Sequence, residues 1–598
     1  MDLYPRMAHV LLAGLTAAAV VTVAGCYTKP PSLGLPCVVD SECGAGEFCV
    51  GGECSANPGA SEAGGETVST SMSTVGTTTV ETTDPTTTDT STTSTSTSTS
   101  TTSTSSTSDA TTGLICPPGM EEENGECVQT VCTEGVCGSV ELGWHRVYDS
   151  VWAKAEEVKR VPQRVSGLVA LPDGGLIVAG EMYGTMMVDG KSEGVADERA
   201  LFLARYDSDG GLKWFNDFPC AHDFTVINDI DYRAASDRVV LIGTVDGAAP
   251  DEVALSLGPG GEIQTTNPDV FVAQFNGDGS FDWHKHFSGS GFQVGFAVSY
   301  SPSGSIVIGG EYEASFDGIN PALPLAAPKS PNTFVFSLSS TGEIAWAQGF
   351  GDVSGNQGFG DLTTIQGNDI FVVGDYEGTM TFPPNTTLPV AEGGQALYMV
   401  RLDGDGSHKW SITADNGVDQ LFTGLASSPN SSAVYATAYV AGKLDVEGFV
   451  YTSGIQSDIL LMKVANNTVL WVQGFGDDKS QLPTSVAMND GGERVILSGN
   501  CGGEVDFGGG LLTALGHSDA CFAEFDADGA HRWSAFVGGD DPPPVWSLYE
   551  SSGPAALRGN DDIYISQSYT NSADLFGTPL TVDEPDGRAS VFARLLAQ

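Results

Sequence analysis

The chain has 598 residues, of which 76 are acidic and only 25 are lysine or arginine, so its formal net charge is −51. This charge excludes nucleic acid as a partner and electrostatic docking on anionic lipid, because both need a cationic surface. It favours a soluble extracytoplasmic protein, and the alternative interpretation is an attraction for cations such as calcium or for basic proteins.

Residues 1–25 have the pattern of a secretory signal peptide. Arg6 supplies the positive start, and residues 11–24 form an apolar run that is too short to span a bilayer. The run ends in Val23-Ala24-Gly25-Cys26, which resembles the bacterial lipobox. The resemblance implies that acyl chains on Cys26 tether the protein in the bacterial cell envelope, at the outer membrane or cell surface. The alternative is an ordinary signal peptide with a chance cysteine.

Two short cysteine-rich segments follow, at residues 26–58 and 114–140. Each is too small to bury a hydrophobic core, so disulfide bonds are the expected stabilisers. Three pairings are possible within each group of four cysteines, and zinc is disfavoured because no CxxC pair is present. The candidate cysteines are Cys37, Cys43, Cys49 and Cys54 in the first segment and Cys116, Cys127, Cys132 and Cys137 in the second.

Residues 59–113, between these two segments, are dominated by serine and threonine. The stretch 67–112 has no aromatic residue, lysine or arginine, so it cannot bury enough apolar surface to offset the entropy of ordering. We therefore predict a disordered stalk that holds the following domain away from the membrane.

Seven tryptophans recur after residue 140 at intervals of 61 to 70 residues, which indicates a repeat. Within each period, four short runs of β-branched and aromatic residues are bounded by Gly, Asp and Asn, which is typical of strands. Four antiparallel strands per repeat describe a propeller blade, so the sequence predicts an all-β fold. The series is Trp144, Trp214, Trp283, Trp346, Trp410, Trp471 and Trp533.

The repeats are out of phase with the ends of this region. It opens on a Trp strand, from Gly143, and stops on a third strand, at Gln598. A closed ring explains the offset, because the N-terminal Trp strand then completes the last blade and leaves no edge unpaired. We predict a seven-bladed β-propeller of four-stranded blades over residues 141–598.

The Trp repeats are similar to the bacterial SBBP-type β-propeller repeat. The residues that carry the resemblance include Gly349-Phe350-Gly351-Asp352 and Gly474-Phe475-Gly476-Asp477, which follow Trp346 and Trp471, whereas other repeats lose this motif. The resemblance implies a propeller fold and a surface location, and it implies no single activity.

The segment RLDGDGSHKW, residues 401–410, is compatible with a calcium loop and with a tight turn. Its counterparts keep the tryptophan in phase but have neither acidic residue at two of the six sites, and the distal glutamate of an EF-hand is missing. We therefore expect residues 403–406 to form a hairpin turn that delivers Trp410 to its blade.

Motifs for phosphate-binding or zinc-protease chemistry are missing from the sequence, and no catalytic residue is assigned. His284 and His286 face one side of a strand but have no evident third partner, so no metal ligand is assigned either. Cys501 and Cys521 lie at adjacent ends of a second and a third strand, which predicts a cross-strand disulfide and leaves Cys220 as the odd cysteine.

Five aspartates follow the tryptophans by five to seven residues. In a blade these positions belong to the variable-loop face, which carries the second-to-third segments and the blade-to-blade loops. A ring of carboxylates there is a candidate site for a cation or a basic ligand, and the alternative is that each aspartate caps a turn. The five are Asp149, Asp352, Asp415, Asp477 and Asp540.

These features together favour a surface-tethered lipoprotein whose propeller binds or scaffolds an unknown protein or glycan. The rival hypothesis is an extracytoplasmic hydrolase or lyase that acts on polysaccharide or peptide through carboxylates of the variable-loop face. Binding without catalysis is the preferred alternative. The sequence indicates no cofactor, with calcium left open, and the expected partners are a membrane, through the lipid anchor, and the unknown ligand.

Overall fold

A computed structural model describes residues 48–50, 53–55, 120–123, 126–129, 136–137, 140–151 and most of 164–597. Within the last range it leaves out residues 189–190, 195–198, 223, 250–251, 320–330, 352–354, 392–394, 416–419, 429–430, 540–550, 560–561, 571 and 582–587. The chain divides into two compact units, residues 18–112 and residues 1–17 with 113–598. In the smaller unit, β1 (Phe48–Val50) and β2 (Glu53–Ser55) form an antiparallel hairpin.

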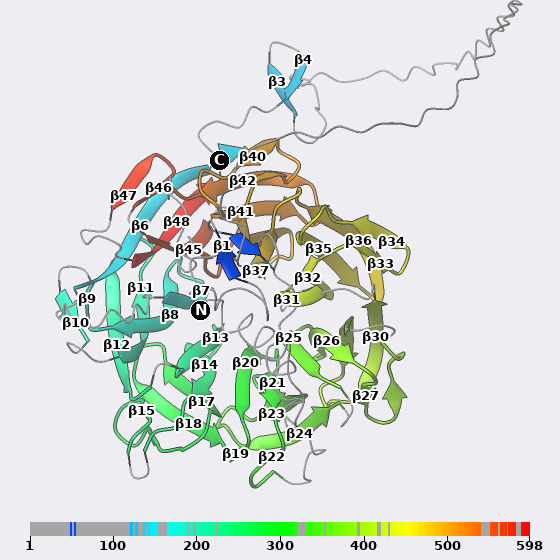
Figure 1. Ribbon diagram of the computed structural model, residues 1–598. Helices are drawn as coiled ribbons and strands as arrows, with labels where there is room; N and C mark the ends of the chain where they lie inside the picture. Colours follow the sequence, from blue (N-terminus) through cyan, green and yellow to red (C-terminus); the bar gives the residue numbers. More distant parts are fainter. Residues whose placement is uncertain are drawn as a thin grey trace, which may run out of the picture. The chain divides into compact units, whose positions relative to one another are not determined.

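The larger unit contains seven antiparallel sheets arranged as blades around a ring (Figure 1). Blade 1 consists of β7 (Arg164–Ala170), β8 (Leu176–Tyr183), β11 (Arg199–Tyr206) and β12 (Leu212–Cys220), and blade 2 of β13 (Val226–Arg233), β14 (Arg238–Val245), β17 (Asp269–Asn276) and β18 (Phe281–Phe287). Blade 3 consists of β20 (Gln293–Tyr300), β21 (Ile306–Tyr312), β23 (Asn332–Leu338) and β24 (Ile344–Phe350), and blade 4 of β25 (Gln357–Thr364), β26 (Ile370–Glu377), β29 (Gln395–Leu402) and β30 (His408–Asp415).

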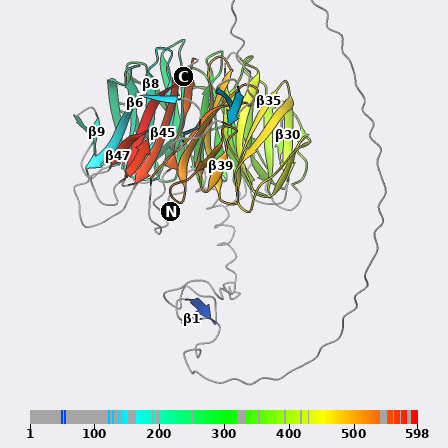
Figure 2. The ribbon, with the colours of Figure 1, turned by 90° about the horizontal axis from the view of Figure 1, so that it is seen from above.

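The remaining blades follow the same order of strands. Blade 5 consists of β31 (Gln420–Ser427), β32 (Ala433–Val440), β35 (Asp458–Ala465) and β36 (Thr468–Phe475), and blade 6 of β37 (Gln481–Met488), β38 (Arg494–Cys501), β41 (Asp519–Asp526) and β42 (His531–Val537). Blade 7 consists of β43 (Ser551–Ser552) with β44 (Ala556–Arg558), then β45 (Asp562–Thr570), β48 (Arg588–Ala597) and β6 (Val140–Val151). Seen from the edge, the strands run across the thickness of the disc (Figure 2).

The ring closes as the sequence predicts. Strand β6 pairs with β48, with Trp144 opposite Arg594 and Tyr148 opposite Ser590. The N-terminal Trp strand is therefore the outer strand of blade 7, and the seven-bladed all-β fold is confirmed.

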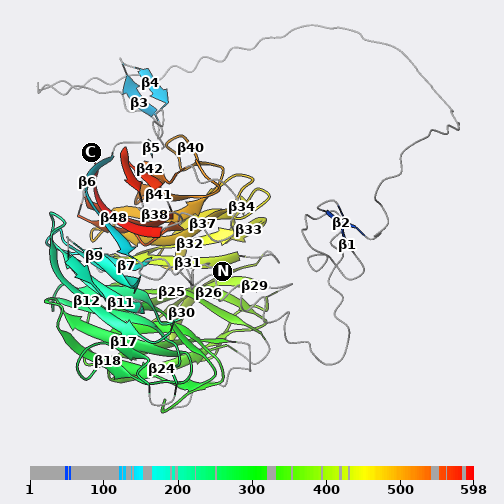
Figure 3. The ribbon, with the colours of Figure 1, turned by 60° about the vertical axis from the view of Figure 1, so that its left-hand side comes forward.

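Some short strands extend the blades at their outer edges, and the others form separate two-stranded hairpins or bridges. Strand β5 (Val136–Cys137) pairs with β42, which gives blade 6 a fifth strand (Figure 3). The other short strands are β3 (Met120–Glu123), β4 (Glu126–Gln129), β9 (Thr185–Val188), β10 (Lys191–Glu193), β15 (Leu255–Ser256), β16 (Glu262–Ile263), β19 (Gly289–Ser290), β22 (Ser315–Phe316), β27 (Thr381–Phe382), β28 (Thr386–Thr387), β33 (Lys443–Val446), β34 (Phe449–Thr452), β39 (Glu504–Asp506), β40 (Leu511–Thr513), β46 (Ser572–Leu575) and β47 (Thr578–Thr581).

The hydrophobic core is divided among the blade interfaces. Each of seven buried clusters joins two neighbouring blades. Successive side chains of a strand point to opposite faces, so in β29 Leu397 and Met399 pack toward blade 5, while Tyr398 and Val400 pack toward blade 3. This two-sided burial explains why the third strands are almost continuously apolar in the sequence.

Four of the seven repeating tryptophans join their blade to the next by a hydrogen bond. The indole Nε1 of Trp346, in blade 3, donates to the carbonyl of Gly404 in the β29–β30 turn of blade 4, at 2.9 Å. Residues 403–406 form that turn, with Gly406 N donating to the carbonyl of Asp403 at 2.9 Å. Equivalent bonds join Trp144 to Ser208, Trp214 to Gly277 and Trp283 to Ser340. The D-G-D-G segment is thus a hairpin turn on which the preceding tryptophan docks.

The described part of the chain has strands, turns and bends but no helix. Within it, no helix long and apolar enough to cross a membrane is found.

Candidate functional site in the central channel

The first strand of each blade lies innermost in the ring (Figure 1). These strands enclose a cavity of about 620 Å³, lined by residues of all seven blades, which we call the central channel. A cavity of this size is within the range of small-molecule sites, roughly 300–1,000 Å³. The central channel is therefore the candidate functional site.

Each of the first six inner strands has a β-bulge at the same place. The register shift leaves one extra residue in each strand, and in blade 7 the inner strand is interrupted at the corresponding point, between β43 and β44. Bulges bend a strand and redirect its side chains. All six extra residues line the central channel: Ser166, Asn228, Phe296, Gly360, Thr423 and Thr484.

Aspartates on two inner strands bridge neighbouring blades across the channel wall. In each case one carboxylate oxygen accepts a hydrogen bond from a backbone N–H of the next blade, which satisfies an edge group that would otherwise be unpaired. Burial raises the pKa of Asp231 to about 6, although its two backbone donors oppose the shift. The three bridges join Asp229 Oδ2 to Val298 N (2.8 Å), Asp231 Oδ2 to Tyr300 N (2.6 Å) and Asp361 Oδ2 to Leu425 N (2.8 Å).

Glu311 and Asp375 form a second kind of acidic feature in this wall. Glu311, near the end of β21, accepts a hydrogen bond at Oε1 from Phe359 N at 2.9 Å. Asp375 of β26 is paired in register with Gly358, the residue before Phe359, so both carboxyl groups approach the same part of β25. Burial raises the pKa of Glu311 to about 8 and that of Asp375 to about 7.

One oxygen of Asp375 is left without a partner. Gln395 Nε2 donates to Oδ2, whereas Oδ1 is buried and accepts no hydrogen bond from any described residue. Asp375 is only 3% exposed and lines the central channel. Its counterpart Glu311 is one methylene longer and reaches the next blade, which accounts for the difference. A buried acceptor without a donor is costly, by about 1–3 kcal/mol.

Three phenylalanines line the same channel as these two carboxyl groups. Phe296 and Phe359 are stacked, with ring centroids 6.2 Å apart and an interplanar angle of 7°. Phe422 of blade 5 also lines the channel and is buried. An apolar, aromatic surround strengthens electrostatic interactions and itself attracts cations.

The rest of the channel wall is less acidic. The carboxylates of blades 2 to 4 face a wall of hydroxyl and apolar groups from blades 5 to 7, where for example Thr484 and Ser552 hydroxyls are 2.7 Å apart. Blade 6 adds Asp490, whose carboxylate pairs with Arg558 at 2.5 Å. Arg164, at blade 1, lies in the field of Glu181. The channel is thus electrostatically one-sided.

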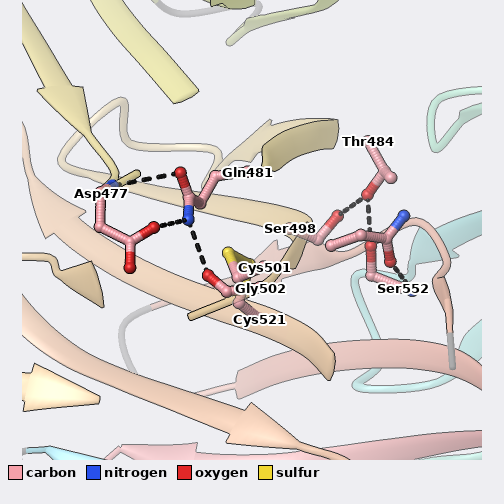
Figure 4. The surroundings of a disulfide bond; sticks show 9 residues. Asp477, Gln481, Thr484, Ser498, Cys501, Gly502, Cys521 and Ser552 are labelled. Atoms are coloured by element: carbon pink, nitrogen blue, oxygen red, sulfur yellow. Dashed lines mark hydrogen bonds between the residues drawn. A yellow bond between two sulfur atoms is a disulfide. The ribbon is translucent and has the colours of Figure 1, made fainter. Parts of the chain in front are cut away.

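Two of the aspartates predicted for the variable-loop face have described side chains. Asp477, in the β36–β37 loop, accepts hydrogen bonds from Lys479 N (2.7 Å), Gln481 Nε2 (2.7 Å) and Glu504 N (2.8 Å) (Figure 4). Burial would raise the pKa of Asp477, but these donors hold it below its usual value. Asp415 is the exposed last residue of β30. Asp477 therefore ties together a loop, as a capping aspartate does.

The other three aspartates are not positioned as side chains. Asp149 lies in β6 opposite Ala589, but its side chain is outside the description, and Asp352 and Asp540 are outside the described residues. A shared ligand site among the five stays a prediction.

Cys501 and Cys521 form the predicted disulfide, which joins β38 and β41 with Cα atoms 5.8 Å apart (Figure 4). Cys220 is half-buried, and its Sγ lies 3.6 Å from the carbonyl oxygen of Arg199. The backbones of Cys49, Cys54, Cys127 and Cys137 lie in β1, β2, β4 and β5, but their side chains are not described, and Cys26, Cys37, Cys43, Cys116 and Cys132 lie outside the described residues. Lipidation and the other disulfides remain predictions.

His284 and His286 do not form a metal centre with a third ligand. His286 Nε2 lies 2.9 Å from Asp269 Oδ2, and the described residues include no group of three His, Cys, Asp or Glu side chains that could hold a metal ion.

The sequence analysis missed Glu311 and Asp375. Both directly follow a glycine near the end of a second strand, in the segments GGEYE and VGDYE. An acidic residue inside an otherwise apolar strand was the available signal, but whether it faces the channel or a neighbouring blade depends on the ring geometry.

Comparisons with known proteins establish no family for this chain. No protein-family model matches the chain, and no curated protein is a significant match. The similarity to SBBP-type repeats therefore stays a prediction. Among solved structures, the Dos1 propeller is similar, with 8% identity, a TM-score of 0.37 and coverage of 76% of this chain and 95% of that one.

Two enzymes are also among the similar structures. A glucose dehydrogenase matches with 12% identity, a TM-score of 0.28 and coverage of 57% of this chain and 95% of that one. An acylaminoacyl peptidase of Pyrococcus horikoshii matches with 10% identity, a TM-score of 0.36 and coverage of 71% of this chain and 53% of that one. At these identities the likeness concerns the propeller fold alone.

Proposed function

We propose that this protein is a surface-tethered bacterial lipoprotein whose propeller binds a terminal group of an extracellular protein or glycan in the central channel. The observation that carries the proposal is the channel itself, a 620 Å³ cavity with the buried carboxyl groups of Glu311 and Asp375 in its wall. Cavities with a few convergent polar groups of perturbed pKa are the usual location of ligand sites. The lipobox-like Cys26 and the Ser/Thr-rich stalk support tethering.

The proposal is tested by narrowing the channel. In the full chain carrying Cys26→Ser, the further change Ser166→Trp places a large ring at a bulged, channel-lining position. Ser340→Trp, at an exposed turn on the outside of the ring, is the matched control. Each protein is immobilised and presented with envelope and secreted material from the producing cells.

The expected result is a ligand retained by the parent chain and by Ser340→Trp and lost from Ser166→Trp. Equal retention by all three proteins would show that the ligand binds outside the channel. The tether is tested separately, since the parent chain with Cys26 should partition into detergent and the Cys26→Ser chain should not.

A hydrolase or lyase acting on polysaccharide or peptide is the second candidate. Its support is the raised pKa of Glu311, because a carboxyl group that stays protonated near neutral pH can serve as a general acid. Turnover of a polysaccharide or peptide panel by the parent chain, abolished by Glu311→Gln, would establish this function in place of binding alone.

A further inference from the structure

We propose that the wall formed by Glu311, Asp375 and the neighbouring phenylalanines is a subsite for a primary alkylammonium group, such as the end of a lysine side chain of a protein ligand. This inference rests on the proposed function, because it names the group that the central channel receives. Three independent features support it: an unsatisfied acceptor, an aromatic surround and a strongly acidic chain.

The first feature is the unsatisfied Oδ1 of Asp375. Asp375 is only 3% exposed, and this oxygen accepts no hydrogen bond from a described residue. Glu311 lies close enough for the two carboxyl groups to repel each other electrostatically. An ammonium group in the channel supplies a compensating charge to the pair. It also supplies the missing N–H donor when the Asp375 side chain turns its buried Oδ1 toward the channel.

The second feature is the apolar character of the surround. Phe296, Phe359 and Phe422 line the channel beside the two carboxyl groups. The methylene stem of a lysine packs on such rings, and its ammonium is attracted to their faces. An amino sugar carries an ammonium group too, but its hydroxyls would need polar partners that these three rings do not supply.

The third feature is the negative net charge of the chain, which acts at long range. The formal net charge of −51 attracts basic ligands toward the propeller before contact is made. Three arginines line the channel wall, and none of them acts on the pKa of Glu311 or Asp375. Arg558 pairs with Asp490, Arg164 lies in the field of Glu181, and Arg233 acts on Tyr300.

Binding of an ammonium is expected to release protons. The groups that face the Glu311–Asp375 pair are Gln395, Glu377 and Tyr398, none of which supplies a positive charge. With no ligand bound, burial keeps part of the pair protonated near neutral pH. The lysine ammonium stays charged below its pKa of about 10.4, so affinity is expected to rise by up to about tenfold per pH unit wherever one proton is released.

The experiment uses calorimetry on the full chain carrying Cys26→Ser. Three probes are compared: Nα-acetyl-lysine amide, the same compound acetylated on its ε-amine, and glucosamine. The second probe keeps the stem and removes the charge, and the third keeps the ammonium and removes the stem. The variants are Asp375→Asn, which keeps the shape of the side chain, and Asp405→Asn in an exposed turn as the control.

The proposal expects the lysine probe to bind at least about tenfold more tightly than the other two, as a charged hydrogen bond and its burial imply. Asp375→Asn should remove that preference, Asp405→Asn should keep it, and affinity should increase from about pH 6 to about pH 8. Equal binding of charged and acetylated probes, tighter binding of glucosamine, or full binding by Asp375→Asn would each overturn the inference. Absence of lysine binding together with channel-dependent capture of a cellular ligand would overturn it and leave the proposed function standing.

Discussion

Trp346 and Gly404 are 58 residues apart in the chain, and the indole N–H of the first donates to the carbonyl of the second at 2.9 Å. The bond crosses from the outer strand of blade 3 to a turn of blade 4, and its equivalents recur around the ring. The periodic tryptophans and the turns between the third and fourth strands are therefore partners in the same contacts between neighbouring blades.

The contribution of this hydrogen bond can be isolated by comparing two tryptophans. Trp346→Phe removes the indole donor, whereas Trp471→Phe removes an Nε1 that is buried without a hydrogen-bond partner. Both changes shrink a ring at the same kind of interface. We expect Trp346→Phe to lower the free energy of unfolding by about 1 kcal/mol more than Trp471→Phe, measured by guanidinium unfolding. Equal losses would mean that ring packing alone is responsible.

The turn glycines provide a second test of the packing of each tryptophan on the turn of the next blade. Gly210 is a left-handed turn residue with a φ of +73°, and a Cβ there would lie 2.7 Å from the Trp144 ring. Gly367 also has a positive φ, of +90°, but nothing lies within 4 Å of its Cβ position.

Gly210→Ala is therefore expected to combine strain with a clash, and Gly367→Ala to show strain alone, on the order of 1 kcal/mol. The difference between the two midpoints of thermal unfolding measures the clash. If the two variants have the same midpoint of thermal unfolding, Trp144 does not pack on the turn that contains Gly210.

The propeller and its closure were predictable because both depend on repetition. One tryptophan per repeat fixed the number of blades, and the Trp strand at Gly143 required closure onto the last blade. The channel was not predictable in the same way. Glu311 and Asp375 lie in strands whose apolar sequences predict burial. Their role follows from the β-bulges of the inner strands. No residue type predicts these bulges, because the extra residue is Phe296 in blade 3 and Gly360 in blade 4.

The disulfide between Cys501 and Cys521 is expected to stabilise blade 6. It closes a loop with a sequence separation of 20, for which chain-entropy estimates give about 3 kcal/mol. The double change Cys501→Ala and Cys521→Ala should lower the free energy of unfolding by roughly this amount. Addition of reductant should lower the stability of the parent protein and leave the double variant unchanged. If the parent protein is unfolded and refolded in reductant and its free energy of unfolding does not change, the disulfide bond is contradicted.

The buried Glu311 predicts a specific dependence of stability on pH. Its pKa rises from an ordinary 4.5 to about 8 on folding, so the folded state binds the proton more tightly than the unfolded state. Its contribution to stability is therefore fully present below about pH 4.5 and is lost as the pH rises through about 8. Glu311→Gln removes this titration and keeps an oxygen for the Phe359 N–H.

The variant and the parent should thus be similarly stable near pH 5, and the variant should gain on the order of 3–5 kcal/mol relative to the parent above pH 8. Asp528→Asn, in an exposed turn, is the control and should show no such divergence. Parallel pH profiles for the parent and Glu311→Gln would contradict the burial of this carboxyl group.

The central claim, that the ligand occupies the channel, is tested most directly by hydrogen–deuterium exchange on the full chain carrying Cys26→Ser, with and without its captured ligand. The account predicts that the ligand slows exchange in the inner strands β20 and β25, around the bulged residues Phe296 and Gly360, and leaves the outer hairpin β33–β34 unchanged. Protection confined to the outer hairpins or to the turns that hold the tryptophans would contradict it.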